Sequence, residues 1–343
     1  MPGLKLFQSN RMEILADRLA DVLSVPMAEP LAPEIVLVQS RGMERWLSMT
    51  LAGRHGVCAN VRFPYPTHFV HALFRDCFPE VPEHSPYEPA VMTWDILEAL
   101  TGLLDRPEFG LLKTYLEGDA DGLKRYQLAV RIAERFDQYL LFRPDWMPAW
   151  ERGEERHWQA VLWREMVRRK GPVHRAALKR RFLDRMRDPA AVPPPTPERI
   201  SIFGISALPP FYMQILAALA TRIEVHLFLM NPCREYWGDI VSEREGHRIA
   251  DRMAGYGRRP EDLHLETGNR LLASMGNLGR EFFRLIAELP VEEFSRFADP
   301  GEGTLLAAVQ SDILNLKERT PGPGEGAVRA DGSIQVHVCH GPL

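Results

Sequence analysis

Apolar runs alternate with amphipathic stretches in the first part of the chain, which predicts strands separated by helices. Two short runs begin this pattern: residues 4–7, a predicted strand with one lysine, and the apolar run Ile35–Val38, which is typical of a buried parallel strand. Helical spacing of apolar residues follows each run, over residues 12–23 and 42–54. This order predicts an α/β fold with a parallel sheet.

The turn after the first predicted strand is where a nucleotide-hydrolysing protein would have its phosphate-binding motif. A nucleotide-hydrolysing lobe of this order has GxxxxGK[ST] here, so that backbone N–H groups surround the phosphates and a lysine adds charge. Residues 8–11 are instead Gln-Ser-Asn-Arg, without glycine or lysine, so we expect no ATP hydrolysis at this turn. Asn10 with Glu13 three residues later predicts a capping box for the helix that follows.

The middle of the chain is predicted to be a helical insertion. Apolar spacing is helical from about residue 66 to residue 187, and the proline-rich segment Pro189–Pro197 is typical of a stiff connector. The predicted helices are Thr67–Phe78, Pro89–Asp105, Leu123–Phe142, His157–Arg169 and His174–Arg187.

The sheet is predicted to resume after the connector. Arg199–Phe203 and Ile223–Leu229 are predicted strands on either side of a helix over Phe211–Leu219, and residues 235–289 are mostly helical.

The C-terminal segment has two predicted features. Thr320–Gly326 is typical of a flexible linker, and Ile334–Cys339 alternates like a strand. Because a strand without a partner cannot bury itself, we expect the native protein to continue beyond Leu343.

Composition agrees with a cytoplasmic globular protein. Of 343 residues, 45% are hydrophobic and 26% charged, and no apolar run approaches the roughly 20 residues of a membrane helix. The first seven residues, Met1–Phe7, lack the long apolar core that is typical of a signal peptide. Cys58, Cys77, Cys233 and Cys339 show no CxxC spacing, which fits a reducing compartment.

Charge is unevenly distributed. The net charge is −4, but residues 164–187 contain ten Lys or Arg and two acids, a local charge of +8. Such a segment either follows a phosphate backbone or forms a solvated helix face, and the sequence leaves both open.

The sequence contains little that indicates a catalytic or metal-binding site. The carboxylates of Glu117–Asp121 and Glu151–Glu155 are typical of solvated charge runs. His337, Cys339 and His340 lie close together but have no distant partner ligand, which makes a poor zinc site. No nucleophile motif is present. We therefore expect no catalytic residue, metal or cofactor in this chain.

The predicted helix Leu123–Phe142 has polar faces beside an apolar stripe that includes Ile132 and Phe136. Its polar side chains provide donors and acceptors suited to base edges, or they decorate an exposed face with salt bridges. They are Arg131, Glu134, Arg135, Asp137 and Gln138.

These segments together resemble the RecC family, the gamma subunits of exodeoxyribonuclease V (the RecBCD helicase–nuclease). Each block is weak by itself, and their number and order make the resemblance specific. The blocks are Ser9–Arg11, Leu37–Ser40, Gly42–Met43, Trp46–Leu47, Ala59–Asn60, Phe63–Pro64, Phe136–Leu140, Arg143–Trp146, Gly204–Pro210, Asn231–Arg234, Tyr236–Asp239, Leu271–Ser274, Leu278–Arg280, Gln310–Leu314 and His337–His340.

The resemblance implies the N-terminal portion of a longer protein, whose family fold is an inactivated superfamily 1 helicase followed by a nuclease-like domain. The chain would hold a helicase-like (RecA-like) parallel-sheet lobe with large helical insertions. The implied parts are 1–66 with 198–234 (the α/β lobe without phosphate loop), 67–188 (helical insertion), 235–319 (second helical region) and 320–343 (linker and first strand of a following, absent lobe).

The implied role is that of a non-catalytic DNA-binding subunit in double-strand break repair by homologous recombination. Such a subunit helps to split duplex DNA and scans the 3′-ended single strand for a Chi-like hotspot. Its implied partners are RecB-like and RecD-like subunits, which use ATP and Mg²⁺, and single-stranded and forked double-stranded DNA. A catalytic helicase or nuclease lobe and a purely structural scaffold remain the alternatives.

The resemblance also implies the scanning residues. Arg41 and Arg45 stand where the enterobacterial family members have Thr and Gln, and Tyr65, His71 and Arg135 stand where those have Leu, Trp and Leu. Because arginine donates to guanine and aromatic rings stack on bases, we expect a different hotspot or none. The implied set is Gln39, Arg41, Arg45, Tyr65, His71, Glu134, Arg135, Asp137, Gln138, Arg143 and Arg175.

Overall fold

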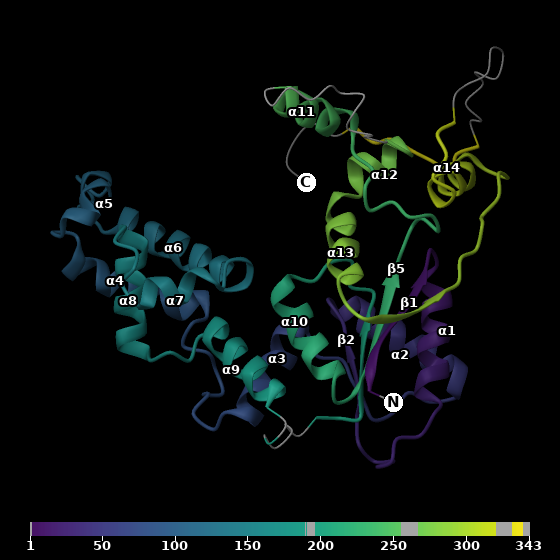
Figure 1. Cartoon of the computed structure of the whole chain (residues 1–343), viewed down its shortest axis with the longest axis horizontal. Helices are drawn as coiled ribbons and strands as arrows, with labels where there is room; N and C mark the ends of the chain where they lie inside the picture. Colours follow the sequence, from purple (N-terminus) through teal and green to yellow (C-terminus); the bar gives the residue numbers. More distant parts are fainter. Residues whose placement is uncertain (1, 189, 191–195, 255–266, 320–330, 339–343) are drawn as a thin grey trace. The chain divides into compact units, whose positions relative to one another are not determined.

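The chain folds into two compact units. The computed structural model describes residues 2–188, 190, 196–254, 267–319 and 331–338. An α/β unit comprises Met1–Pro64, Glu198–Ala207 and Glu224–Leu343, and a helical unit comprises Tyr65–Pro197 and Leu208–Ile223 (Figure 1).

The α/β unit is built on a parallel sheet, as predicted. Within the described residues the sheet has six strands in the order β3-β2-β4-β5-β1-β6, and every neighbouring pair is parallel. The apolar runs form its central strands, and all five residues of β4 are buried, as in a sheet covered on both faces. The strands are β1 (Gly3–Ser9), β2 (Glu34–Leu37), β3 (Val61–Arg62), β4 (Arg199–Phe203), β5 (Glu224–Met230) and β6 (Val291–Ser295).

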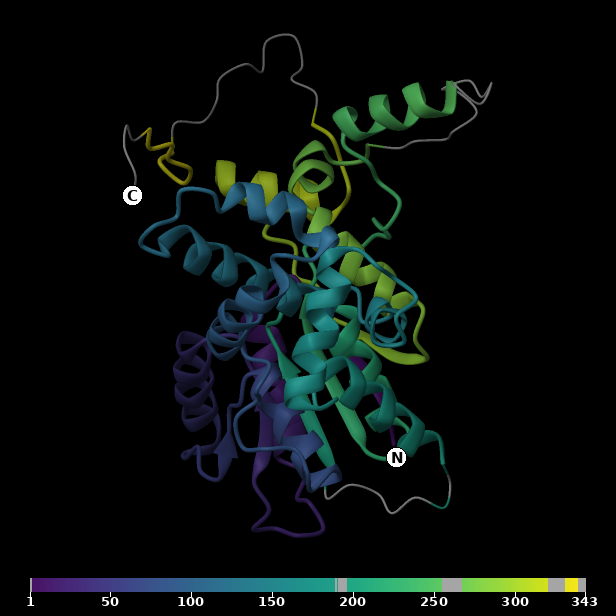
Figure 2. The same ribbon diagram turned by 90° about the vertical axis from the view of Figure 1, so that its left-hand side faces the viewer.

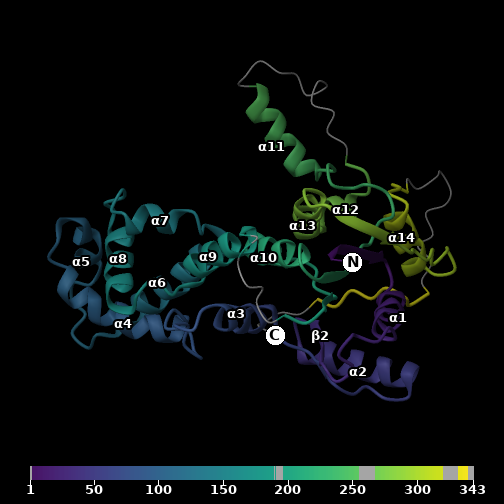
Figure 3. The ribbon, with the colours of Figure 1, turned by 60° about the horizontal axis from the view of Figure 1, so that its bottom comes forward.

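Six helices of the described chain complete this unit. Helix α1 buries Leu15 and Leu19, and it lies beside α2 and the strands (Figure 3). Arg54 on α2 binds Asp17 and Asp21 on α1 at 2.8 and 3.1 Å. The helices are α1 (Met12–Leu23), α2 (Arg41–His55), α11 (Glu243–Ala254), α12 (Arg270–Met275), α13 (Asn277–Ala287) and α14 (Leu305–Leu314).

The helical unit packs around aromatic side chains, and Phe109, Phe136 and Trp163 are fully buried in its core. Figure 2 shows its helices as the blue and teal ribbons. It includes α10, whose residues fall within the predicted segment 198–234. The helices are α3 (Pro66–Cys77), α4 (Pro89–Leu103), α5 (Gly110–Tyr115), α6 (Leu123–Phe142), α7 (Trp146–Glu151), α8 (Trp158–Lys170), α9 (Arg175–Arg187) and α10 (Pro210–Ala220), with a 3-10 turn at Pro107–Phe109.

Some predictions need correction. Strand β6 lies inside the segment 235–319 that was predicted to be helical, and residues 334–338 form no strand. Residue 339, the predicted linker Thr320–Gly326 and most of Pro189–Pro197 lie outside the described residues. Within the described part of the chain, no helix has the length and apolar character needed to cross a membrane.

Candidate nucleic-acid interface

The turn after β1 is occupied by internal hydrogen bonds. The Asn10 side chain donates to the carbonyl of Ala298 at 2.8 Å and accepts from its N–H at 2.9 Å. It therefore does not cap α1, whose first residues have no side-chain cap, so the predicted capping box with Glu13 is wrong. The backbone N–H of Arg11 donates instead to the Ser9 hydroxyl oxygen at 3.1 Å.

Buried amides continue this network along the carboxyl edge of the sheet. Asn231, after β5, donates to Gln8 at 2.8 Å and accepts from the Trp237 indole at 3.0 Å. Gln8 in turn donates to Glu293 of β6 at 3.3 Å. At the edge where ligands of open α/β sheets bind, these side chains bind one another.

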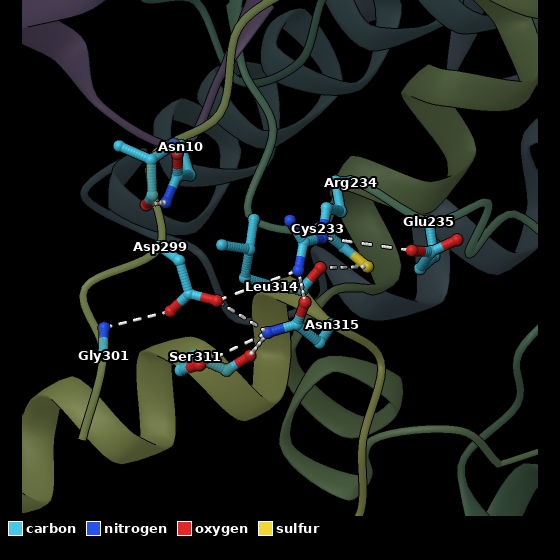
Figure 4. A network of polar contacts seen from close by, with 10 residues as sticks. Asn10, Cys233, Arg234, Glu235, Asp299, Gly301, Ser311, Leu314 and Asn315 are labelled. Atoms are coloured by element: carbon cyan, nitrogen blue, oxygen red, sulfur yellow. Dashed lines mark hydrogen bonds and ion pairs between the residues drawn. The ribbon is translucent and has the colours of Figure 1, made fainter.

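A second network holds the segment after β6 (Figure 4). Asn315 donates to Asp299 at 3.1 Å and receives a hydrogen bond from Arg234. Hydrogen bonds from Gly301, at 3.0 Å, and from Asn315 and Ser311 lower the pKa of Asp299 to about 2, and the Arg234 charge adds to the shift. These bonds tie α14 to the carboxyl edge of the sheet.

The end of β2 is different, because its polar side chains face solvent. Gln39, Arg41 and Arg45 are all exposed. Ser40 caps α2 by accepting from the Met43 N–H at 3.1 Å, and Arg41 and Arg45, four residues apart, lie on one face of that helix. Across the described ranges, none of the three exposed side chains has a hydrogen bond or ion pair. They are available to a ligand.

In the helical unit, His71, Asp137 and Arg175 line one groove of about 620 Å³. Arg175 Nη2 lies 2.6 Å from Asp137 Oδ1, and both side chains are about four-fifths buried. Burial raises the pKa of Asp137, and the Arg175 guanidinium opposes that shift. His71 Nε2 lies 3.0 Å from the carbonyl oxygens of Pro82 and Glu83, so this nitrogen is the donor.

Glu134, Arg135 and Gln138 lie on another face of α6 and line a separate groove. Arg135 donates to Gln138 at 2.8 Å, and Glu134 pairs with Arg131 at 3.3 Å. The exposed face of α6 therefore carries a salt bridge and also borders a polar hollow. Two further lining residues, Trp158 and Gln159 of α8, belong to no motif that would single them out in the sequence.

Tyr65 and Arg143 each stand beside an aromatic ring. The Tyr65 ring stacks on His68 with centroids 5.8 Å apart. The Arg143 guanidinium lies 5.8 Å from the ring centre of exposed Trp146, and it donates to the Phe142 carbonyl at 3.2 Å. Each of the two residues therefore lies against an aromatic ring of the helical unit.

At least six of the ten Lys and Arg side chains in the basic segment 164–187 form ion pairs with acids. Arg168 and Arg169 bind Glu165 at 2.7 Å, Lys170 binds Asp95 at 2.6 Å, and Arg181 binds a further carboxylate. The pairing favours a folded, paired helix surface over a phosphate track.

Candidate metal ligands were sought throughout the described part of the chain. Among the described residues, no group of three or more His, Cys, Asp or Glu side chains is placed to hold a metal ion. In the run Glu151–Glu155, Glu151 accepts from His174 at 2.8 Å and from Trp163 at 3.3 Å, and Glu154 binds Arg152. Cys339 and His340 lie outside the described residues.

The eleven implied scanning residues are distributed over both units. Gln39, Arg41 and Arg45 belong to the α/β unit and the other eight to the helical unit. Within the helical unit, the structure brings together His71, Asp137 and Arg175 in one groove, and Glu134, Arg135 and Gln138 in the other.

Comparison with known proteins identifies relatives over nearly the whole chain. The RecBCD enzyme subunit RecC of Escherichia coli (strain K12) is 38% identical over 99% of this chain and 34% of its own length. The RecC subunits of Mycolicibacterium smegmatis and Haemophilus influenzae are 35% and 30% identical over 99% and 98% of this chain, and over 30% and 35% of their own lengths. The chain thus spans about a third of the length of these curated relatives. The RecC N-terminal domain family matches residues 4–316, and the chain belongs to that family.

Proposed function

We propose that this chain is the N-terminal portion of a DNA-binding subunit of a RecBCD-type helicase–nuclease, without a catalytic centre of its own. It acts in the cytoplasm in double-strand break repair by homologous recombination, with RecB-like and RecD-like partners that use ATP and Mg²⁺. It helps to split duplex DNA and scans the 3′-ended strand for a Chi-like hotspot. We further propose that the α/β unit is an inactivated superfamily 1 helicase lobe.

The observation that supports this role most is the contrast between two turns at the carboxyl edge of the sheet. The turn after β1 is closed by its bonds to Ala298, whereas the turn after β2 exposes Gln39, Arg41 and Arg45. Glutamine and arginine are the side chains that pair with adenine and guanine edges. A sheet edge that offers them to solvent suits a passing single strand.

The chemistry of α6 supports base reading over simple phosphate binding. Its grooves combine carboxylates with arginines, and a carboxylate repels phosphate but accepts from base amino groups. Arg168, Arg169 and Lys170 of the segment 164–187 are ion-paired with acids and therefore add little attraction for a phosphate backbone. The proposed interface therefore depends on base edges and stacking more than on net charge.

The test uses the full-length protein assembled with its partner subunits. Asp137→Asn and Arg143→Gln should each weaken the sequence preference that the complex shows in a library of single strands, by roughly tenfold at the affected position. The ion-paired, exposed Arg168→Gln is the matched control and should leave the preference intact.

Two outcomes would overturn the proposal. If hotspot response survives Asp137→Asn and Arg143→Gln in complexes that assemble normally, the scaffold alternative is correct. If the chain alone hydrolyses ATP or cleaves DNA, it is a catalytic lobe.

A further inference from the structure

The second groove of the helical unit is lined in part by residues outside the implied scanning set. We call it the α6–α8 groove, and its volume is about 320 Å³, at the small end of ligand sites in proteins. Two helices from separate parts of the sequence form it, and Trp158 and Gln159 at the start of α8 face the polar side of α6. Its lining residues are Arg131, Ile132, Glu134, Arg135, Gln138, Trp158 and Gln159.

The hydrogen bonds already made in the groove leave both donors and acceptors for a ligand. Gln159 donates from Nε2 to the Tyr139 hydroxyl at 3.4 Å, which leaves its Oε1 as an acceptor. Arg135 uses Nη1 for Gln138 Oε1, so that its other N–H groups and the Gln138 amide remain donors. Glu134 accepts from Arg131 through Oε2, which leaves Oε1.

We propose that the α6–α8 groove receives one unstacked nucleobase of the scanned strand, with Trp158 as the ring that the base contacts and Gln159 as a reader of its edge. This inference rests on the proposed function and adds two specificity-determining residues to it. A nucleobase has the matching chemistry, since it combines a flat apolar face with an edge of mixed donors and acceptors. A phosphate group matches less well, because the Glu134 carboxylate lines the same hollow.

The first test substitutes Gln159 in the full-length protein assembled with its partners. Gln159→Leu should relax base preference at one position of a single-strand library by about tenfold and leave the other positions unchanged. The dependence of affinity on salt should stay the same, because a base contact releases no phosphate counterion. Gln127→Leu is the matched control, since Gln127 is an exposed glutamine of α6 outside the groove.

The second test substitutes Trp158. Base–aromatic contact predicts that Trp158→Leu lowers single-strand affinity about tenfold, and that Trp158→Phe retains most of it. Trp94→Leu, at an indole that is 62% exposed on α4, should have no effect. Trp158 also packs against the core of the helical unit, where its ring centroid lies 6.4 Å from that of Phe109. Circular dichroism must therefore show that the Leu variant is folded, and Gln159→Leu tests the groove independently.

The outcomes separate this inference from the proposed function. If Asp137→Asn abolishes the sequence preference while Gln159→Leu and a folded Trp158→Leu leave binding unchanged, the inference is wrong and the proposed function stands. If Gln159→Leu weakens all sequences equally with a shallower salt dependence, the groove binds backbone and the inference is also wrong. If the intact complex shows no sequence preference at all, both are wrong.

Discussion

His226 shows how burial in the sheet controls a single titration. It lies on β5, 2% exposed, with Nε2 3.2 Å from Glu224 Oε2. Burial lowers the pKa of its imidazole to about 4; the Glu224 carboxylate opposes this shift, and the Lys5 and Arg199 cations add to it. Its Nδ1 is buried without a hydrogen-bond partner in the described part of the chain. The ring is therefore neutral in the folded protein at neutral pH.

We expect the protein to lose stability as the pH falls from about 6.5 to about 4. The unfolded chain binds this proton at the ordinary histidine pKa, above the folded value, so acid favours unfolding across that window. The full difference corresponds to about 3 kcal/mol. Urea unfolding at a series of pH values measures it. His226→Gln should remove most of the slope and the exposed His55→Gln should keep it; a slope unchanged in the His226 variant contradicts the prediction.

At the scale of elements, Asn10 joins the first strand–helix turn to the segment after β6. Its two hydrogen bonds with Ala298 are partly buried, so Asn10→Ala should lower the free energy of unfolding by about 1–2 kcal/mol. Urea unfolding is the measurement. Glu13→Ala is the control, because Glu13 forms no capping box and its loss should cost no more than about 0.5 kcal/mol. Equal losses in both variants would instead indicate a capping box.

The elements that the sequence predicted are those that bury continuous apolar surface. Every residue of β4 is buried, and its apolar residues Ile200, Ile202 and Phe203 were sufficient to predict it. Strand β6 was missed because it lies at the sheet edge, where four of its five residues are exposed and two are glutamates. The six-residue helices α5 and α7 are too short for a periodic pattern. Residues 334–338 alternate like a strand, but they are mostly exposed and pair with nothing in the described chain.

At the scale of the whole molecule, the family resemblance implied Gln39 and Arg41, but tertiary contacts decide what each residue does. The pairing of Asp137 with Arg175 joins α6 to α9, and no local pattern predicts it. The sequence left the role of the charged segment 164–187 open for the same reason, since Lys170 pairs with an acid on α4. Sequence alone thus identified many polar positions of the candidate interface, and the fold showed which are free.

The free arginines of α2 give a prediction for the complete enzyme. The family resemblance implies Thr and Gln at positions 41 and 45 in the enterobacterial members, and both arginines here are exposed. If they read guanines, Arg41→Thr combined with Arg45→Gln should reduce guanine preference at the corresponding positions by roughly tenfold each. The double variant would then carry the two residues that the resemblance implies for the enterobacterial members. Selection from a single-strand library by the assembled enzyme measures this change.

Arg168→Gln with Arg181→Gln, a double substitution of exposed but ion-paired arginines, is the matched control. An equal change in both double variants would mean that the arginines act through charge alone, and no change in either would remove α2 from the interface.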